Sequence, residues 1–201
     1  MRQPTLTATR FACLALLMAT GCATVKMQRL RPDYATVDRQ ATRRLVVVTQ
    51  PLPDGVAAVG DLFSKVARRY VNQKREYFIV KQERSMAEGF APQSVCGEGL
   101  EGVLWLKPTV KKVGEGVEGT VDAQLVRCSD GQEVWAAQSA GSFPSDDKHL
   151  VEVAKQYVSD LGPTVAPYVA PAFNLLRPML DTLPEPAPNE DIANEKIELG
   201  E

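Results

Sequence analysis

The sequence of 201 residues is poor in histidine, on which many catalytic and metal sites depend. Its one histidine, His149, follows Lys148 in an expected first helical turn, so a Ser-His-Asp or Cys-His arrangement would depend on it alone. Of its four cysteines, Cys13 and Cys22 lie near the N-terminus; the other two, Cys96 and Cys128, do not complete a tetrahedral zinc site with one histidine unless acidic ligands join them, and the sequence identifies none. The glycines at 97–99 and 114–116 lack the spacing of a phosphate-binding loop. We therefore expect no enzyme, with no catalytic residue, cofactor or metal ion.

A surplus of positive charge is also missing. The chain has 23 basic and 25 acidic residues. Residues 1–21 hold two arginines and no acid, so the chain without them has 21 basic and 25 acidic residues, a net charge of −4. A nucleic-acid-binding protein needs a positive surface to neutralise phosphates, so we expect no nucleic-acid partner.

The longest apolar run lies at the N-terminus and is too short for a stable membrane-spanning helix. Arg2 and Arg10 precede apolar residues 11–18, an order typical of a secretory signal peptide. The next four residues, Ala19-Thr20-Gly21-Cys22, resemble the lipobox of bacterial lipoproteins, although Ala19 stands where leucine is commoner. In that motif the cysteine receives a diacylglycerol, and its amino group is acylated after cleavage.

We therefore expect residues 1–21 to be a signal peptide and Cys22 to be the lipidated first residue of the mature protein. The alternatives are an ordinary signal peptide with an incidental cysteine and an uncleaved membrane helix. One acyl chain binds a membrane reversibly, whereas the several chains of a lipoprotein give permanent attachment. Ala23 after the cysteine resembles the sorting pattern for the outer membrane, so we expect an outer-membrane protein that faces the periplasm.

The remaining chain is long enough for one domain with a hydrophobic core. Residues 22–43 are polar, with Leu30 and Tyr34 as isolated apolar positions, and we interpret them as a tether. We expect residues 44–183 to form a single α/β domain. Residues 184–201 are rich in proline and then acidic, which is typical of a disordered tail.

The first part of this domain has the pattern of a β-α-β unit. Residues 45–49 are a β-branched run that suits a buried strand. Apolar residues at helical spacing follow over residues 59–70, and residues 77–80 form a second strand. The exposed side of the helix carries four basic residues, Arg68, Arg69, Lys74 and Arg75. They could contact lipid headgroups or a partner, although a solvated helix face is the simpler interpretation.

Residues 102–139 predict a three-stranded antiparallel meander with turns at 114–116 and 129–132. Cys96 lies just before the first of these strands, and Cys128 closes the second. Antiparallel pairing brings the start of one strand beside the end of the next. We therefore predict a Cys96–Cys128 disulfide, in a compartment where disulfides persist. Two buried free thiols are the alternative.

After the meander, the pattern predicts a helix over residues 150–161 that ends at Gly162. Residues 163–183 are apolar and interrupted by four prolines. They indicate either a kinked helix packed on the domain or an element that docks a partner or contacts a membrane. The expected fold is thus α/β (α+β), in which the β-α-β unit and the meander form one mixed sheet with helices packed on it.

The order of these elements resembles a known periplasmic domain. It is shared by the curli-secretion lipoprotein, the penicillin-binding-protein activator lipoprotein and the amino-terminal domain of TolB. Residues 45–49, 125–128 and 131–135, the last with the sequence Gly-Gln-Glu-Val-Trp, carry the resemblance. Because these relatives bind other envelope proteins, the resemblance implies a non-catalytic assembly or accessory factor. Its partner would be an envelope protein or a second copy of the chain.

Other segments are similar to a family of uncharacterised lipoproteins of myxobacteria and leptospires. The similar residues are 30–34, 43–51, 173–184 and 195–201. This resemblance covers most of the chain but implies no particular activity. A small-ligand or lipid-binding lipoprotein is the alternative function, in which residues 163–183 would cover an apolar cavity.

Overall fold

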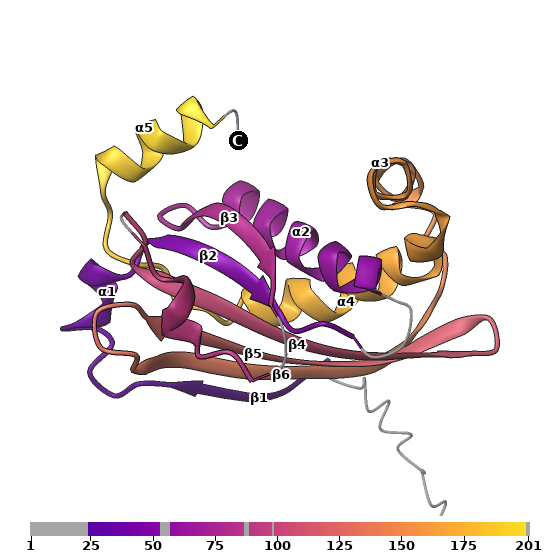
Figure 1. Cartoon of the computed structure of the whole chain (residues 1–201), viewed down its shortest axis with the longest axis horizontal. Helices are drawn as coiled ribbons and strands as arrows, with labels where there is room; N and C mark the ends of the chain where they lie inside the picture. Colours follow the sequence, from indigo (N-terminus) through magenta and orange to yellow (C-terminus); the bar gives the residue numbers. More distant parts are fainter. Residues whose placement is uncertain (1–23, 53–56, 87–88, 98, 200–201) are drawn as a thin grey trace, which may run out of the picture.

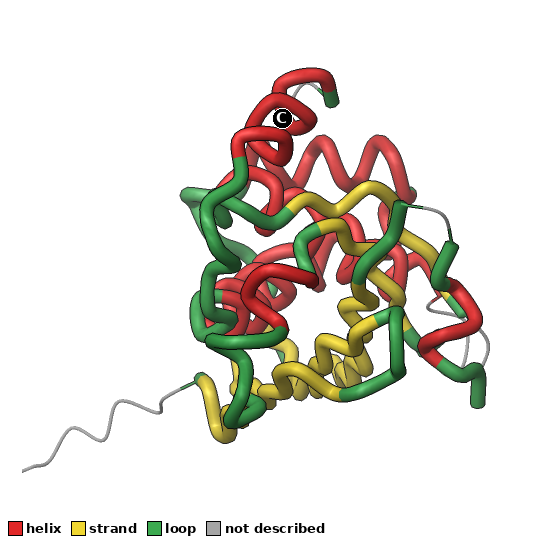
Figure 2. The backbone as a smooth tube through the Cα atoms, turned by 90° about the vertical axis from the view of Figure 1, so that its left-hand side faces the viewer, coloured by secondary structure: helices red, strands yellow, loops and turns green. Residues whose placement is uncertain are grey.

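The computed structural model describes residues 24–52, 57–86, 89–97 and 99–199. They form one mixed sheet of six strands in the order β1-β6-β5-β4-β2-β3, with helices packed on it (Figure 1). The view in Figure 2 shows the strands on one side and the longer helices on the other. This arrangement confirms the predicted α+β fold. No helix within the described ranges is long and apolar enough to cross a membrane.

The predicted β-α-β unit consists of β2 (Arg44–Thr49), α2 (Ala57–Lys74) and β3 (Ile79–Ser85), with β2 and β3 parallel. The β-branched residues of β2 are buried because the strand lies inside the sheet, between β3 and β4. The side chain of Asn72 fixes the end of α2 against β3: it accepts from the amide of Val80 over 2.7 Å and donates to the Val80 carbonyl.

The predicted meander consists of β4 (Gly102–Val113), β5 (Gly116–Arg127) and β6 (Glu133–Pro144), and all neighbours are antiparallel. β6 is longer than expected, since it continues beyond Ser139 until Pro144 pairs with Gly116. The β4–β5 turn depends on glycine, because Gly114 has a φ of +57°. Figure 1 shows this hairpin projecting at one end of the sheet, while α1 lies at the other end.

Two apolar clusters form on the two faces of the sheet. The larger one lies between the sheet and helices α2 and α4, and includes Phe63, Leu104 and Trp135. On the opposite face, the segment between β3 and β4 covers part of β2 and β4. It contains the short helix η1 (Pro92–Val95), which buries Val95.

The prediction of a tether over residues 22–43 is wrong for residues 24–43, the part that the structure describes. β1 (Val25–Leu30) pairs antiparallel with β6, and α1 (Asp38–Ala41) follows. Tyr34 is buried, and its hydroxyl donates to the carbonyl of Pro184 over 2.8 Å. Burial raises the pKa of this hydroxyl to about 12, so it keeps its proton.

The prediction of a disordered tail over residues 184–201 is also wrong for residues 184–199, which the structure describes. α5 (Glu190–Glu198) begins at Asn189, whose side chain accepts from the amide of Ile192. This is the usual arrangement of an N-cap. Ile192 is completely buried, and Glu195 pairs with Arg44 at 2.8 Å. The C-terminal segment is therefore packed on the start of β2.

Residues 163–183 form a kinked helical segment packed on the domain, which is the first of the two alternatives predicted for them. α3 (Val151–Leu161) ends at Gly162, η2 (Pro163–Tyr168) follows, and α4 (Val169–Leu180) lies across the sheet. The large side chains of α4 fill the main core and are completely buried: Leu175, Leu176, Met179 and Leu180.

Candidate functional site

The proposed lipidation residue, Cys22, lies outside the described residues. The described chain begins two residues later, at the edge of the sheet. The carbonyl of Thr24 accepts a hydrogen bond from the amide of Ala140 in β6, over 2.8 Å. Val25 then pairs with Ser139 as the first residue of β1. An anchor at Cys22 would therefore be connected directly to the sheet.

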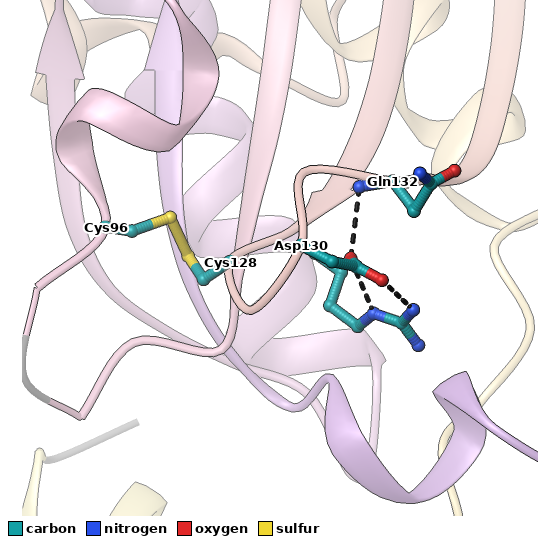
Figure 3. Close-up of a disulfide and its surroundings, with 5 residues drawn as sticks. Cys96, Cys128, Asp130 and Gln132 are labelled. Atoms are coloured by element: carbon teal, nitrogen blue, oxygen red, sulfur yellow. Dashed lines mark hydrogen bonds and ion pairs between the residues drawn. A yellow bond between two sulfur atoms is a disulfide. The ribbon is translucent and has the colours of Figure 1, made fainter.

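The predicted Cys96–Cys128 disulfide is present, with a Cα–Cα distance of 5.6 Å (Figure 3). It joins the segment between β3 and β4 to the end of β5. The amide of Cys128 donates to the carbonyl of Glu101 over 2.9 Å, which holds the two ends of the hairpin in register. The strand pairing expected from the sequence places the two thiols together, as predicted.

A cluster of charged residues that the sequence interpretation missed lies beside the disulfide. Arg127 donates from Nε to Asp130 and from Nη1 to Asp38, at 3.0 Å and 2.6 Å. The hydrogen bond from Arg127 lowers the pKa of Asp130 to about 2. Asp130 also accepts from the amide of Gln132 (Figure 3). These contacts fix the β5–β6 turn on α1.

Asp38 lies at the buried end of this cluster. Burial raises its pKa, although Arg127 opposes that shift. Its Oδ2 atom is buried and has no hydrogen-bond partner within the part of the chain described. No signal in residues 33–38 distinguishes this aspartate from an exposed one, because its burial depends on the packing of β1 and α1.

The arginines in α2 and directly after it are used in contacts within the domain. Arg68 pairs with Glu83 at 2.6 Å, and Arg75 pairs with Glu185 at 2.9 Å. Arg69 donates to Gln156 on α3 over 3.1 Å. These contacts account for the three arginines without a lipid headgroup or a partner.

His149, the residue considered for catalysis, is exposed. His149 lies in the loop before α3, where its amide donates to the Asp147 carboxylate over 2.8 Å. Gly114 and Gly116 flank the tip of the β4–β5 hairpin. In the described ranges, no group of three or more His, Cys, Asp and Glu residues is arranged to hold a metal ion.

A groove of about 620 Å³ opens between α3, the start of α4 and the tip of the β4–β5 hairpin. Most of its lining is apolar, and most of these side chains come from α3 and α4. They include Leu150, Val151, Ala154, Val158, Val169 and Ala170. The charged residues that line it carry both signs: Lys112, Glu115, Asp146, Asp147 and Lys155.

The groove exists because α3 lies at the edge of the helix layer, on the side toward which the hairpin projects (Figure 1). Tyr157 is the one buried side chain of α3, and its ring packs edge-on against Phe173 at 6.1 Å. Leu150, Ala154 and Val158 recur every four residues and form one face of the helix. This spacing is a signal for an apolar face, but it does not distinguish a face in the core from a face that lines a groove.

No family model and no curated protein matches the chain. Solved structures with a similar fold include the PelC dodecamer of Paraburkholderia phytofirmans. It is 16% identical, with a TM-score of 0.43, over 70% of this chain and 94% of that chain. The hypothetical protein CT253 of Chlamydia trachomatis is 12% identical, with a TM-score of 0.42, over 71% and 96%.

The lipoprotein GNA1162 of Neisseria meningitidis is also similar. It is 14% identical, with a TM-score of 0.36, over 59% of this chain and 96% of that chain. These values describe a loose similarity of fold.

Proposed function

We propose that the chain is a lipid-anchored envelope protein without catalytic activity, attached to the outer membrane through Cys22, and that it binds an amphipathic helix of a partner protein. The groove between α3, α4 and the hairpin carries this proposal, because it combines apolar walls with charged residues of both signs.

The length of the groove along α3 corresponds to about two helical turns. Its α3 wall is formed by Leu150, Ala154 and Val158, which span about two turns, or about 12 Å of helix. The small side chains of Ala154 and Ala170 leave room for larger apolar residues of a partner. A helix that presents residues at i, i+4 and i+7 to such a groove is a common form of peptide recognition.

The charges of the groove select the kind of helix. Lys112 can pair with acidic residues of the partner, and Glu115 with basic ones, whereas Lys155 is already paired with Glu152 over 2.7 Å. Charged pairs at the rim of an interface mainly set orientation and specificity, whereas apolar residues at its centre supply most of the binding energy. The expected partner helix is therefore apolar on one side and carries both charges on its flanks.

A small ligand or lipid is the alternative occupant. That function would require residues 163–183 to cover an apolar cavity, but Leu175, Leu176 and Met179 are buried in the core instead. The residues of this segment that line the groove are Ala166, Pro167, Val169 and Ala170, and they form one of its walls without covering it. The apolar wall along α3 is about two turns long, so a helix that lies along it covers more of the groove than an isolated small molecule would.

The test is photo-crosslinking in intact envelopes, with the crosslinking residue at Ala154 and, as a control, at Ser159 on the exposed side of α3. We expect the Ala154 position to form a stoichiometric complex with one envelope protein, and the crosslinked peptide to be an amphipathic helix. Ala154→Glu should abolish the complex, whereas Ser159→Glu should not. Crosslinks to lipid alone would contradict the proposal and favour the alternative.

A further inference from the structure

The folded domain begins very close to the proposed anchor. Thr24 is already hydrogen-bonded to Ala140 of β6, and only Ala23 lies between Thr24 and Cys22. Two residues span at most about 7 Å when fully extended. A lipidated Cys22 would lie in the headgroup region of the bilayer, so this edge of the domain must lie at the membrane surface.

The direction of β1 determines which end of the domain is nearer the membrane. β1 runs from Val25, which pairs with Ser139, to Leu30, which pairs with Trp135. The chain therefore enters from the side of β6 that leads to Pro144, and Pro144 pairs with Gly116 at the hairpin tip. The four residues from Ala140 to Pro144 extend about 13 Å in that direction. α1 lies at the opposite end of the sheet (Figure 1).

The hairpin end has side chains that suit the membrane interface. Val113 is 44% exposed at the tip of β4, directly after Lys111 and Lys112. Val151, at the start of α3, is 47% exposed. An exposed apolar residue beside lysines is favourable at the interface, because the lysine stems contact apolar surface while their ammonium groups stay in water.

We propose that the tip of the β4–β5 hairpin is the membrane-contacting surface of the anchored domain, with Val113 at the level of the lipid headgroups. This inference rests on the proposed lipidation of Cys22. The acyl chains hold the protein on the bilayer, and the hairpin sets its orientation. The groove beside the hairpin then opens at the bilayer surface, where it meets a partner helix that lies on the membrane.

The chain offers a matched pair of positions for the test. Val113 and Val37 are both valines of similar exposure, 44% and 40%, and Val37 lies at the start of α1, at the other end of the sheet. Val113→Cys and Val37→Cys would each be labelled with the same environment-sensitive fluorophore, with the Cys96–Cys128 disulfide kept oxidised. The lipidated proteins are then reconstituted in phosphatidylethanolamine and phosphatidylglycerol vesicles that contain a lipid-borne quencher.

We expect several-fold stronger quenching at position 113 than at position 37. Equal quenching at both positions, or stronger quenching at position 37, in protein that floats with the vesicles would overturn the orientation and leave the anchoring intact. Cys22→Ser should not float. If the unsubstituted protein also fails to float, the proposed lipidation is wrong and the orientation falls with it.

Discussion

Arg127 at the end of β5 donates a hydrogen bond from Nη1 to Oδ1 of Asp38 in α1, over 2.6 Å. Asp38 is completely buried, and the Arg127 side chain is 9% exposed. The pair connects the N-terminal segment to the meander. A buried ion pair adds little stability compared with a well-packed apolar pair at the same place. Removing one of its two residues is costly, however, because the other charge then stays buried away from water without its partner.

We expect Arg127→Met to lower the free energy of unfolding by about 3–5 kcal/mol, because the buried Asp38 carboxylate loses its hydrogen-bonded partner and keeps only Arg31, at 4.0 Å. Urea denaturation followed by far-UV circular dichroism measures this change. The double variant Arg127→Met, Asp38→Asn should be more stable than the single variant, because it removes the buried carboxylate charge that has lost its hydrogen-bonded arginine. If the double variant is equally unstable or worse, the loss comes from packing of the arginine stem and not from the charge.

The pH dependence of the free energy of unfolding should reveal how much the Asp130–Arg127 interaction contributes to stability. Its pKa is about 2, below the ordinary value for aspartate, because of the hydrogen bond from Arg127. Above the ordinary pKa of aspartate, Asp130 is ionised in both the folded and the unfolded chain, and its low folded pKa stabilises the fold. As the pH falls below that ordinary value, the unfolded chain binds a proton before the folded chain does, so this stabilisation is lost by about pH 2. Asp38 has a raised pKa, so its contribution changes in the opposite direction.

The comparison of Asp130→Asn with the unsubstituted protein isolates this contribution. The variant should be less stable at neutral pH, and the difference in free energy of unfolding should shrink toward zero as the pH approaches 2. Urea denaturation at a series of pH values measures the difference. A difference that does not change with pH would show that the carboxylate acts through the turn geometry alone.

Lys196 of α5 caps the C-terminal end of α2. Its ammonium group donates to the carbonyls of Asn72, at 3.0 Å, and of Arg75. A cation at this end of a helix is stabilised by the helix dipole and satisfies carbonyls that have no partner within the helix. We expect Lys196→Met to lower the melting temperature, with a loss of about 1–2 kcal/mol. Lys74→Met, at an exposed lysine in the last turn of α2, is the matched control and should have little effect.

The sequence predicted the elements whose signal is local and failed where stability comes from distant contacts. The β-branched run of β2 and the helical spacing in α2 identify their elements directly, because both bury a continuous apolar set. β1 has no continuous set of buried apolar residues, because every residue of this strand except Val25 is exposed. It is a strand because its main chain pairs with β6, and composition does not encode that pairing.

The C-terminal helix had a signal that the composition obscured. Asn189 followed by two acidic residues is an N-terminal helix pattern, and Ile192 is the apolar residue that anchors it. The preceding prolines and the net negative charge favoured disorder instead. The sequence did not predict the groove either, since the groove depends on how α3, α4 and the tip of the β4–β5 hairpin are placed relative to one another.

The Cys96–Cys128 disulfide should contribute to the stability of the domain by an amount that depends on the number of residues between the two cysteines. Cys96 and Cys128 are 32 residues apart, and closing a loop of that length removes conformational freedom from the unfolded chain. In the chain-entropy model the expected stabilisation is about 3–4 kcal/mol. The double variant Cys96→Ser, Cys128→Ser should therefore unfold at a clearly lower urea concentration than the oxidised protein.

Reduction provides the matched comparison for this variant. Dithiothreitol should lower the unfolding midpoint of the unsubstituted protein to about that of the double variant, while the double variant itself should not respond. The bridged segment also covers Val46 and Val103 on the face of the sheet away from α2. Faster amide hydrogen exchange should therefore appear first at β2 and β4 when the bridge is broken, because those strands lose their cover. A midpoint that is insensitive to reduction would mean that the second apolar cluster holds residues 89–97 in place without the bridge.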